Sequence, residues 1–268
     1  MEPERGGQAS VRDMLCHQEA IDYWTSWNLG CEMLFPYKDD NPTNRVPLLT
    51  WAFIGANLLV FFRWQFPLSP QGWEGYLFSY GFVPYEFFRD PLSEWQSIYT
   101  STFSHGGTFH LLGNMLFLYL FGDNVEDAMG KIRFALFYLT CGTAAALAQG
   151  FVATDSEIPM VGASGAISGV IAGYLLLYPR ANVRVFYWFF LFVGTLFVPA
   201  WVVLGLWVTE QILALPESMK TAGGVAVMAH LGGFAAGLVL TPLFKKSNLR
   251  LFQKPRMRAF SRQGRRIR

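Results

Sequence analysis

Hydrophobic residues in this chain are gathered into six long blocks rather than spread at the period of an amphipathic helix or strand. Each block has a helix-like length, and a helix that crosses a bilayer needs about 20 mostly apolar residues. Backbone groups in lipid must bond to one another, and runs without strand alternation do this as helices. The pattern therefore predicts six membrane-spanning helices. Their expected ranges are 46–66, 108–122, 132–153, 159–178, 185–208 and 223–244.

The polar parts of the chain lie at its two ends and in one long loop. We expect a polar N-terminal leader over 1–45, a six-helix membrane domain over 46–244 and a basic tail over 245–268. The start lacks the charged and apolar regions of a signal peptide, and we expect residues 1–32 to be dispensable. The loop 67–104 is rich in aromatic rings, which favour the membrane interface. We therefore expect a partly membrane-embedded first loop, with a compact extramembrane cap as the alternative.

Composition and charge agree with a membrane protein. The chain is 52% hydrophobic and 15% charged, whereas a soluble domain carries about 25% charged residues. The net charge is only +2, yet residues 245–268 hold ten Lys or Arg and no acid. Directly after an apolar block, this favours a tail facing anionic lipid rather than one that binds nucleic acid. Basic residues also dominate the loops on that side, so we expect both termini to be cytoplasmic and the membrane to be the plasma membrane.

Cysteine and histidine spacing does not indicate a metal site or a disulfide framework. The chain has three cysteines at irregular positions, Cys16, Cys31 and Cys141. Cys16, His17 and Cys31 lack the fourth ligand of a structural zinc site. The remaining histidines show no HExxH pattern. We therefore predict no metal and no cofactor.

One serine lies between glycines where the fourth apolar block begins, in the segment Val161–Gly169. If a helix starts near Pro159, Ser164 is in its first turns, where amide groups point outward and the helix dipole is positive. Those conditions suit the stabilisation of a developing oxyanion. The alternative is ordinary helix packing, because Gly165, Gly169 and Gly173 form a stripe of small residues spaced by four.

Three histidines lie at or in the apolar blocks, where ionisable side chains are costly and mark candidate functional sites. His110 and Asn114 are four residues apart and share one helix face. Together they are candidate donors to an oxyanion. A structural hydrogen bond between helices is the alternative reading of this pair.

The third of these histidines, His230, follows Ala229 in a second small-residue stripe, Ala229, Gly233 and Gly237. If the two stripes pack together, His230 comes within reach of Ser164. A serine hydroxyl is a poor nucleophile unless a base takes its proton, and His230 can be that base. The fourth and sixth blocks contain no acidic residue to orient the imidazole. We therefore predict a Ser-His dyad rather than a triad.

In this order, the motifs resemble those of the rhomboid intramembrane serine proteases, over residues 33–244. The resemblance implies an all-α membrane protein built as a six-transmembrane-helix bundle, with Ser164 as nucleophile and His230 as general base. It implies an oxyanion site made by His110, Asn114 and the Ser164 amide. It also implies that the substrates are transmembrane segments of other proteins in the lipid bilayer. The resemblance rests on His105, His110-x-x-x-Asn114, Gly162-Ala163-Ser164-Gly165 and Ala229-His230-x-x-Gly233-x-x-x-Gly237.

The resemblance assigns supporting roles as well. His105 matches a structural or water-binding histidine, and Gly162, Gly165, Gly233 and Gly237 support the close packing around the site. The first loop, the fifth block and the loop 209–222 correspond to a lateral gate and cap.

Two departures from the family pattern affect details of the site. Some members carry a Tyr four residues after the nucleophile, stacked on the catalytic histidine, and this chain has Ser168 there. It also lacks the Trp-Arg pair that some relatives have in the first loop. The alternatives are a non-catalytic relative that binds membrane clients, and a transporter or channel. The chain keeps both Ser164 and His230 and shows no internal repeat, so we expect a protease.

Overall fold

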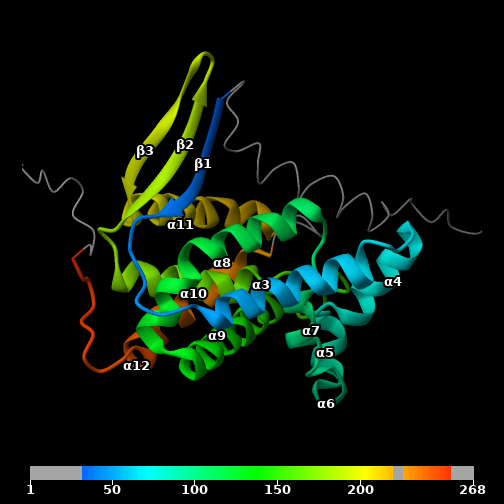
Figure 1. The fold of residues 1–268 in the computed structure, drawn as a ribbon. Helices are drawn as coiled ribbons and strands as arrows, with labels where there is room; N and C mark the ends of the chain where they lie inside the picture. Colours follow the sequence, from blue (N-terminus) through cyan, green and yellow to red (C-terminus); the bar gives the residue numbers. More distant parts are fainter. Residues whose placement is uncertain (1–31, 220–225, 255–268) are drawn as a thin grey trace, which may run out of the picture.

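The structure is a computed structural model that describes residues 32–219 and 226–254 (Figure 1). Most of the expected leader, with Cys16, His17 and Cys31, lies outside the described residues, as do residues 255–268. The described chain is a helical bundle with a small sheet at one end. Its longer helices are α3 (Leu48–Val60), α8 (Thr108–Met129), α9 (Lys131–Val152), α10 (Ser164–Leu177), α11 (Ala200–Ser218) and α12 (Val227–Phe244).

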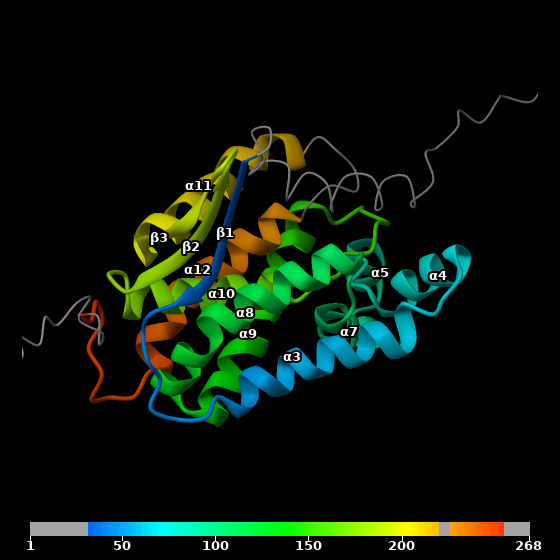
Figure 2. The ribbon, with the colours of Figure 1, turned by 45° about the horizontal axis from the view of Figure 1, so that its top comes forward.

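The centre of the bundle is α10, which packs against α8, α9 and α12 (Figure 2). Eleven of its residues are buried, and they face all sides of the helix. A helix that is apolar all round belongs in a core rather than at a surface. Because Ser164 begins this central helix, the core of the bundle fixes the position of its hydroxyl.

Small residues let α10 and α12 approach backbone to backbone. A Cβ on Gly233 would overlap the carbonyl oxygen of Gly165, and a Cβ on Gly237 would lie 2.5 Å from the carbonyl oxygen of Gly169. No larger side chain fits at either position without moving a backbone. The two small-residue stripes therefore pack against each other and bring the start of α10 next to α12.

The acidic end of α8 is part of the helix and is largely buried, whereas the apolar pattern placed a turn there. Glu126 accepts hydrogen bonds from the backbone N–H groups of Leu49 and Thr50 at 3.1 and 2.8 Å. Its carboxylate thereby satisfies donors in the first turn of α3, which have no partner within that helix. Asp127 likewise accepts from the backbone of Asn44 at 3.0 Å. These contacts extend the helix to Met129 and attach the start of α3 to it.

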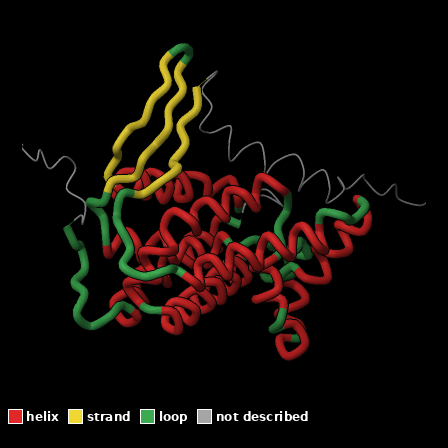
Figure 3. The backbone as a smooth tube through the Cα atoms, in the orientation of Figure 1, coloured by secondary structure: helices red, strands yellow, loops and turns green. Residues whose placement is uncertain are grey.

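The prediction of an all-α fold holds only in part, because the chain is mostly helical but also contains a three-stranded antiparallel sheet (Figure 3). Its order is β1-β2-β3, with β1 at Glu32–Asp39, β2 at Asn182–Phe189 and β3 at Phe192–Pro199. The expected helix over 185–208 is therefore a hairpin followed by the start of α11. This segment is rich in β-branched and aromatic residues, which favour strands. The hairpin tip is apolar, and Leu191 is 94% exposed.

The predicted first loop folds into short helices. After α3 the chain makes a π-helical turn, η1 (Phe61–Gln65), and then α4 (Pro70–Tyr80), α5 (Pro84–Arg89), α6 (Pro91–Glu94) and α7 (Ser97–Phe103). Phe82 is fully buried against Ile98 and Ala146, whereas Trp95 is 54% exposed. Some rings thus pack inside this region and others face outward. Its insertion into a membrane stays a prediction.

Two of the described helices, α9 and α12, are long and apolar enough to cross a membrane. The central helix α10 is apolar but has only 14 residues. Acidic side chains lower the apolar character of α8 and α11. The chain is thus mostly helical with at least two candidate spans, and the arrangement as six spans stays a prediction.

Candidate active site

Ser164 is the first residue of α10. The helix therefore begins five residues later than the expected start at Pro159. The preceding segment is extended, because Met160 exchanges backbone hydrogen bonds with Phe82 at 2.8 and 2.9 Å. Gly162 has φ +121°, a conformation that favours glycine, and its N–H donates to Ser101 O at 2.9 Å. The turn at Gly162 therefore places Ser164 at a helix N-terminus, where amide groups have no partner within the helix.

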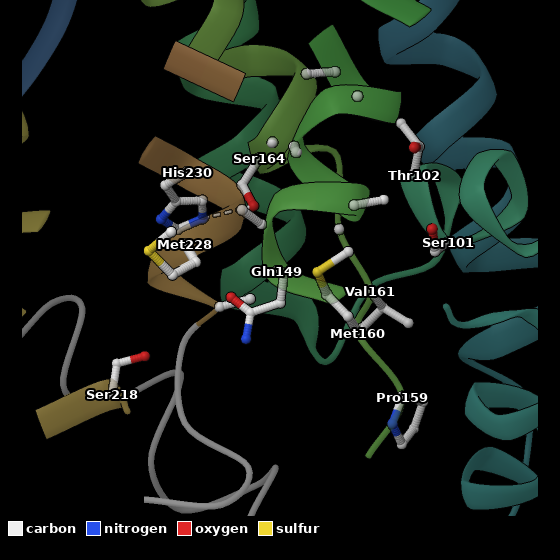
Figure 4. A pocket seen from close by; sticks show the side chains of 18 of the residues that line it. Ser101, Thr102, Gln149, Pro159, Met160, Val161, Ser164, Ser218, Met228 and His230 are labelled. Carbon is white, nitrogen blue, oxygen red and sulfur yellow. Dashed lines mark hydrogen bonds between the residues drawn. The ribbon is translucent and has the colours of Figure 1, made fainter. Parts of the chain in front are cut away.

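His230 faces Ser164 from α12, across the contact of the two small-residue stripes (Figure 4). Its Nε2 lies 2.8 Å from the Ser164 Oγ. The imidazole is 5% exposed, and the serine is partly buried. A hydroxyl that donates to an imidazole at this distance can lose its proton to it. The structure thus brings the two predicted residues together, and their catalytic role stays a prediction.

The predicted oxyanion donors converge on the segment just before Ser164. A Cβ on Gly162 would lie 2.7 Å from the His110 ring and 3.5 Å from the Asn114 Nδ2. The Asn114 Nδ2 is buried and has no hydrogen-bond partner among the described residues. A buried donor without an acceptor is costly, so this amide is available to a negatively charged oxygen in the site.

His105 lies behind His110 rather than beside Ser164. Its ring is fully buried and its centroid is 5.2 Å from that of His110. The backbone of His105 exchanges two hydrogen bonds with the side chain of Gln65, at 3.0 and 3.1 Å. These bonds fix the segment that leads into α8. In residues 32–219 and 226–254, no three His, Cys, Asp or Glu side chains are arranged to share a metal ion.

A cavity of about 590 Å³ opens over the dyad, with Ser164, His230, His110 and Asn114 in its wall. Figure 4 shows Met160 and Met228 on either side of the dyad, with the Gln149 side chain nearby. A mainly apolar wall with a few polar groups is typical of a site that binds a ligand. The remaining polar lining includes Thr102, Asp155, Ser156 and Glu157.

The imidazole is held from α11, by two residues that the sequence reasoning missed. The Gln211 Oε1 lies 2.7 Å from the His230 Nδ1, and the Trp207 ring centroid is 6.0 Å from that of His230. The Ser168 hydroxyl bonds within α10, where its Oγ donates to the Ser164 carbonyl oxygen at 2.7 Å. The sequence predicts a fifth helix that ends at 208 and a loop over 209–222, whereas α11 continues to Ser218. A polar residue four positions after Trp207 in an apolar run was the available signal.

The Rhomboid domain family profile matches residues 92–247, more than half of the chain, and this range holds the dyad and the oxyanion donors. The chain belongs to the rhomboid family. Rhomboid protein 1, mitochondrial, of Saccharomyces cerevisiae is 28% identical over 238 residues, 86% of this chain and 61% of the relative. The human presenilin-associated rhomboid-like protein, mitochondrial, is 29% identical over 197 residues, 70% of this chain and 46% of the relative.

A third relative is rhomboid-like protein 11, chloroplastic, of Arabidopsis thaliana, which is 30% identical over 162 residues, 57% of this chain and 53% of the relative. The chain thus spans about half to three fifths of the length of these rhomboids. Their names place them in mitochondria and chloroplasts. The prediction of a plasma membrane with cytoplasmic termini is therefore wrong, because short extramembrane parts do not distinguish one membrane from another.

Proposed function

We propose that this rhomboid is a serine endopeptidase that hydrolyses peptide bonds in or near transmembrane segments of other membrane proteins. The observation that carries the proposal is the 2.8 Å contact between the Ser164 Oγ and the His230 Nε2 at the wall of the cavity. Binding of membrane clients without cleavage would not require a serine and a histidine in this geometry. The names of the relatives favour an organellar membrane as the place of cleavage.

In the first half of the reaction, the Ser164 hydroxyl attacks the carbonyl carbon of the scissile peptide while the His230 Nε2 takes its proton. The carbonyl oxygen becomes an oxyanion. The Asn114 Nδ2, the His110 ring and the Ser164 N–H surround the place where that oxygen would lie. Collapse of the intermediate breaks the C–N bond, and His230 returns the proton to the leaving amine. The product is an ester on Ser164.

In the second half, a water molecule in the cavity gives a proton to His230 and attacks this ester. The oxyanion forms again at the same donors, its collapse breaks the bond to the Ser164 oxygen and releases the carboxylic acid, and His230 gives its proton to that oxygen to restore the hydroxyl. Polar groups at membrane depth are tolerated where they line a cavity that holds water. A helical substrate must unwind locally, because its amide groups are otherwise shielded. Substrates with Gly or Pro near the cleaved bond should therefore be cut faster than Leu-rich ones.

The test uses the purified protein in liposomes with a model transmembrane substrate that contains Gly and Pro. We expect the wild type to cleave it, and Ser164→Ala and His230→Ala to lower kcat by at least about 10³-fold, since each removes an essential group. A fluorophosphonate probe should label the wild type and not Ser164→Ala.

Circular dichroism and thermal unfolding show whether each variant is folded. Cleavage that survives Ser164→Ala in a folded protein would overturn the proposal. A folded wild type that neither cleaves helix-weakened substrates nor reacts with the probe would favour the client-binding alternative.

A further inference from the structure

We propose that Gln211 is a positioning residue that holds the His230 ring with its proton on Nδ1, so that Nε2 is free to accept the proton of Ser164. The inference rests on the proposed function and adds a third member to the predicted dyad. It starts from the position of Gln211 on α11, where the side chain is 3% exposed and its Oε1 lies 2.7 Å from the His230 Nδ1.

The direction of this hydrogen bond decides which ring nitrogen carries hydrogen. An amide oxygen only accepts, so the Nδ1 that contacts the Gln211 Oε1 must be the donor. A neutral imidazole carries one proton, which leaves the Nε2 lone pair to accept from the Ser164 hydroxyl at 2.8 Å. The other tautomer would put a hydrogen on Nε2, facing the nucleophile, where it cannot act as a base.

The contacts around His230 assign this role to Gln211. In the described part of the chain, the hydrogen bonds of the ring go to Ser164 on one side and Gln211 on the other. Trp207 lies one helical turn before Gln211 and packs its ring at 41° to the imidazole. Together the two α11 residues fix the orientation of the ring, one by a hydrogen bond and one by contact.

A neutral amide fits this depth better than the carboxylate of a Ser-His-Asp triad. An ionised group in the membrane interior is expensive, whereas a hydrogen-bonded amide is buried at much lower cost. The amide oxygen still orients the ring and faces the imidazolium that forms when His230 takes the proton. Its partial charge stabilises that cation less than a carboxylate would. Replacing the amide by a carboxylate should therefore make His230 a stronger base.

The test compares Gln211→Met, which keeps the length but has no acceptor oxygen, with Gln211→Glu, which keeps the oxygen. Mispositioning a general base should lower kcat by about 10- to 100-fold in Gln211→Met, with KM changed less than about twofold. Gln211→Glu should retain kcat, and the acid limb of its pH–kcat profile should move to higher pH. Thr143→Val is the control, because Thr143 lies on α9, outside the expected gate, and its hydroxyl bonds among the described residues to Leu139 O of the same helix, at 3.0 Å. It should cleave like the wild type.

A second readout does not depend on cleavage. In protein labelled with ¹⁵N-histidine, the His230 signals, assigned by their loss in His230→Ala, should show the proton on Nδ1 in the wild type. They should show a mixture of tautomers in Gln211→Met. A wild-type proton on Nε2 would overturn the inference, as would a folded Gln211→Met that keeps kcat within about twofold.

Equal loss of kcat in folded Gln211→Met and Gln211→Glu would also overturn it, because then the acceptor oxygen is not what matters. If Gln211→Met does not fold, the pH–kcat profile of Gln211→Glu and the tautomer of His230 in the wild type still test the inference. If the wild type cleaves nothing and is not labelled by the probe, the proposed function fails. The tautomer measurement then tests separately whether Gln211 holds the proton of His230 on Nδ1.

Discussion

Single side chains carry the chemistry of this site, and each is placed by a different element. Ser164 begins α10, His230 comes from α12 and Asn114 from α8. No described element holds more than one of these three, so the site forms only when the bundle is packed. The Asn114 Nδ2 is the clearest sign of function among them, because it is buried and has no acceptor in the described part of the chain.

At the residue scale we predict that Asn114→Ala lowers kcat by about 10²- to 10³-fold, the usual effect of removing one oxyanion donor. KM should change little, because the lost hydrogen bond forms mainly in the transition state. The measurement is steady-state cleavage of a model substrate in liposomes. Asn57→Ala is the control, since Asn57 is also buried but bonds within α3, to Phe53 O at 2.8 Å. Equal effects of the two changes would contradict an oxyanion role.

Most of the candidate site could be predicted from the sequence. A polar residue in an apolar run marks Gln211 as a candidate, but its partner could not be predicted. The spacing of His110 and Asn114 fixes a shared helix face, and the two stripes of small residues indicate which helices touch. The contact of Gln211 with His230 depends on where α11 begins and how it is rotated against α12. The local pattern of apolar residues predicts neither the start of α11 nor its rotation.

Elements were harder to predict where strands and helices share an apolar composition. Residues 185–199 read as the first part of a membrane helix by hydropathy, yet they form most of a hairpin. A short apolar run does not distinguish a buried strand from a buried helix. The shift of the α10 start from Pro159 to Ser164 has another cause, since the backbones of Met160 and Gly162 bond to Phe82 and Ser101 in the first-loop region instead. Both differences arise from tertiary contacts rather than from local preference.

At the element scale we predict that Gly233→Ala destabilises the protein by about 3 kcal/mol or more. Overpacking commonly costs about 1–3 kcal/mol, and here the obstacle is the Gly165 backbone, which cannot rotate away. Separating α10 from α12 should also lengthen the Ser164–His230 contact and lower kcat.

The measurement is thermal unfolding in detergent together with cleavage. Gly205→Ala in α11 is the matched control, because a Cβ there meets no atom of the described residues within 4 Å. It should be neutral or stabilise by up to about 1 kcal/mol through better helix propensity. A Gly233→Ala protein that unfolds at the same temperature as Gly205→Ala would show that the helices do not touch here.

Across the whole molecule, the site lies at one end of α10 and the sheet is attached at the other. Asp39, at the end of β1, accepts hydrogen bonds from the Tyr174 hydroxyl at 2.9 Å and from the Asn124 Nδ2 at 3.0 Å. Tyr174 lies ten residues after Ser164, which is about 15 Å along the helix axis. Asp39 therefore connects the sheet to two helices of the bundle without touching the site.

The charge of Asp39 should make the stability of the molecule depend on pH. Burial raises the pKa of this carboxyl to about 7, and the Asp123 and Asp40 carboxylates add to the rise against the hydrogen bonds from Tyr174 and the Asn41 N–H. In the unfolded chain its pKa is near 3.8. Below that value both states hold the proton. Between pH 3.8 and 7 only the folded state does, so the stability from this group is lost as the pH rises and is gone above about 7.

Asp39→Asn should therefore become more stable relative to the wild type as the pH rises, by up to about 1.4 kcal/mol for each pH unit of that window. Any loss of hydrogen bonding that the amide causes is independent of pH. The change in the stability difference between the two proteins from pH 5 to pH 8 therefore reports the titration of Asp39. The measurement is the unfolding midpoint of both proteins in detergent across this range. Parallel curves for the two proteins would mean that Asp39 is already ionised at pH 5 in the folded state. Cleavage at a fixed pH should be nearly equal in the two proteins, because the carboxyl and the dyad lie at opposite ends of α10.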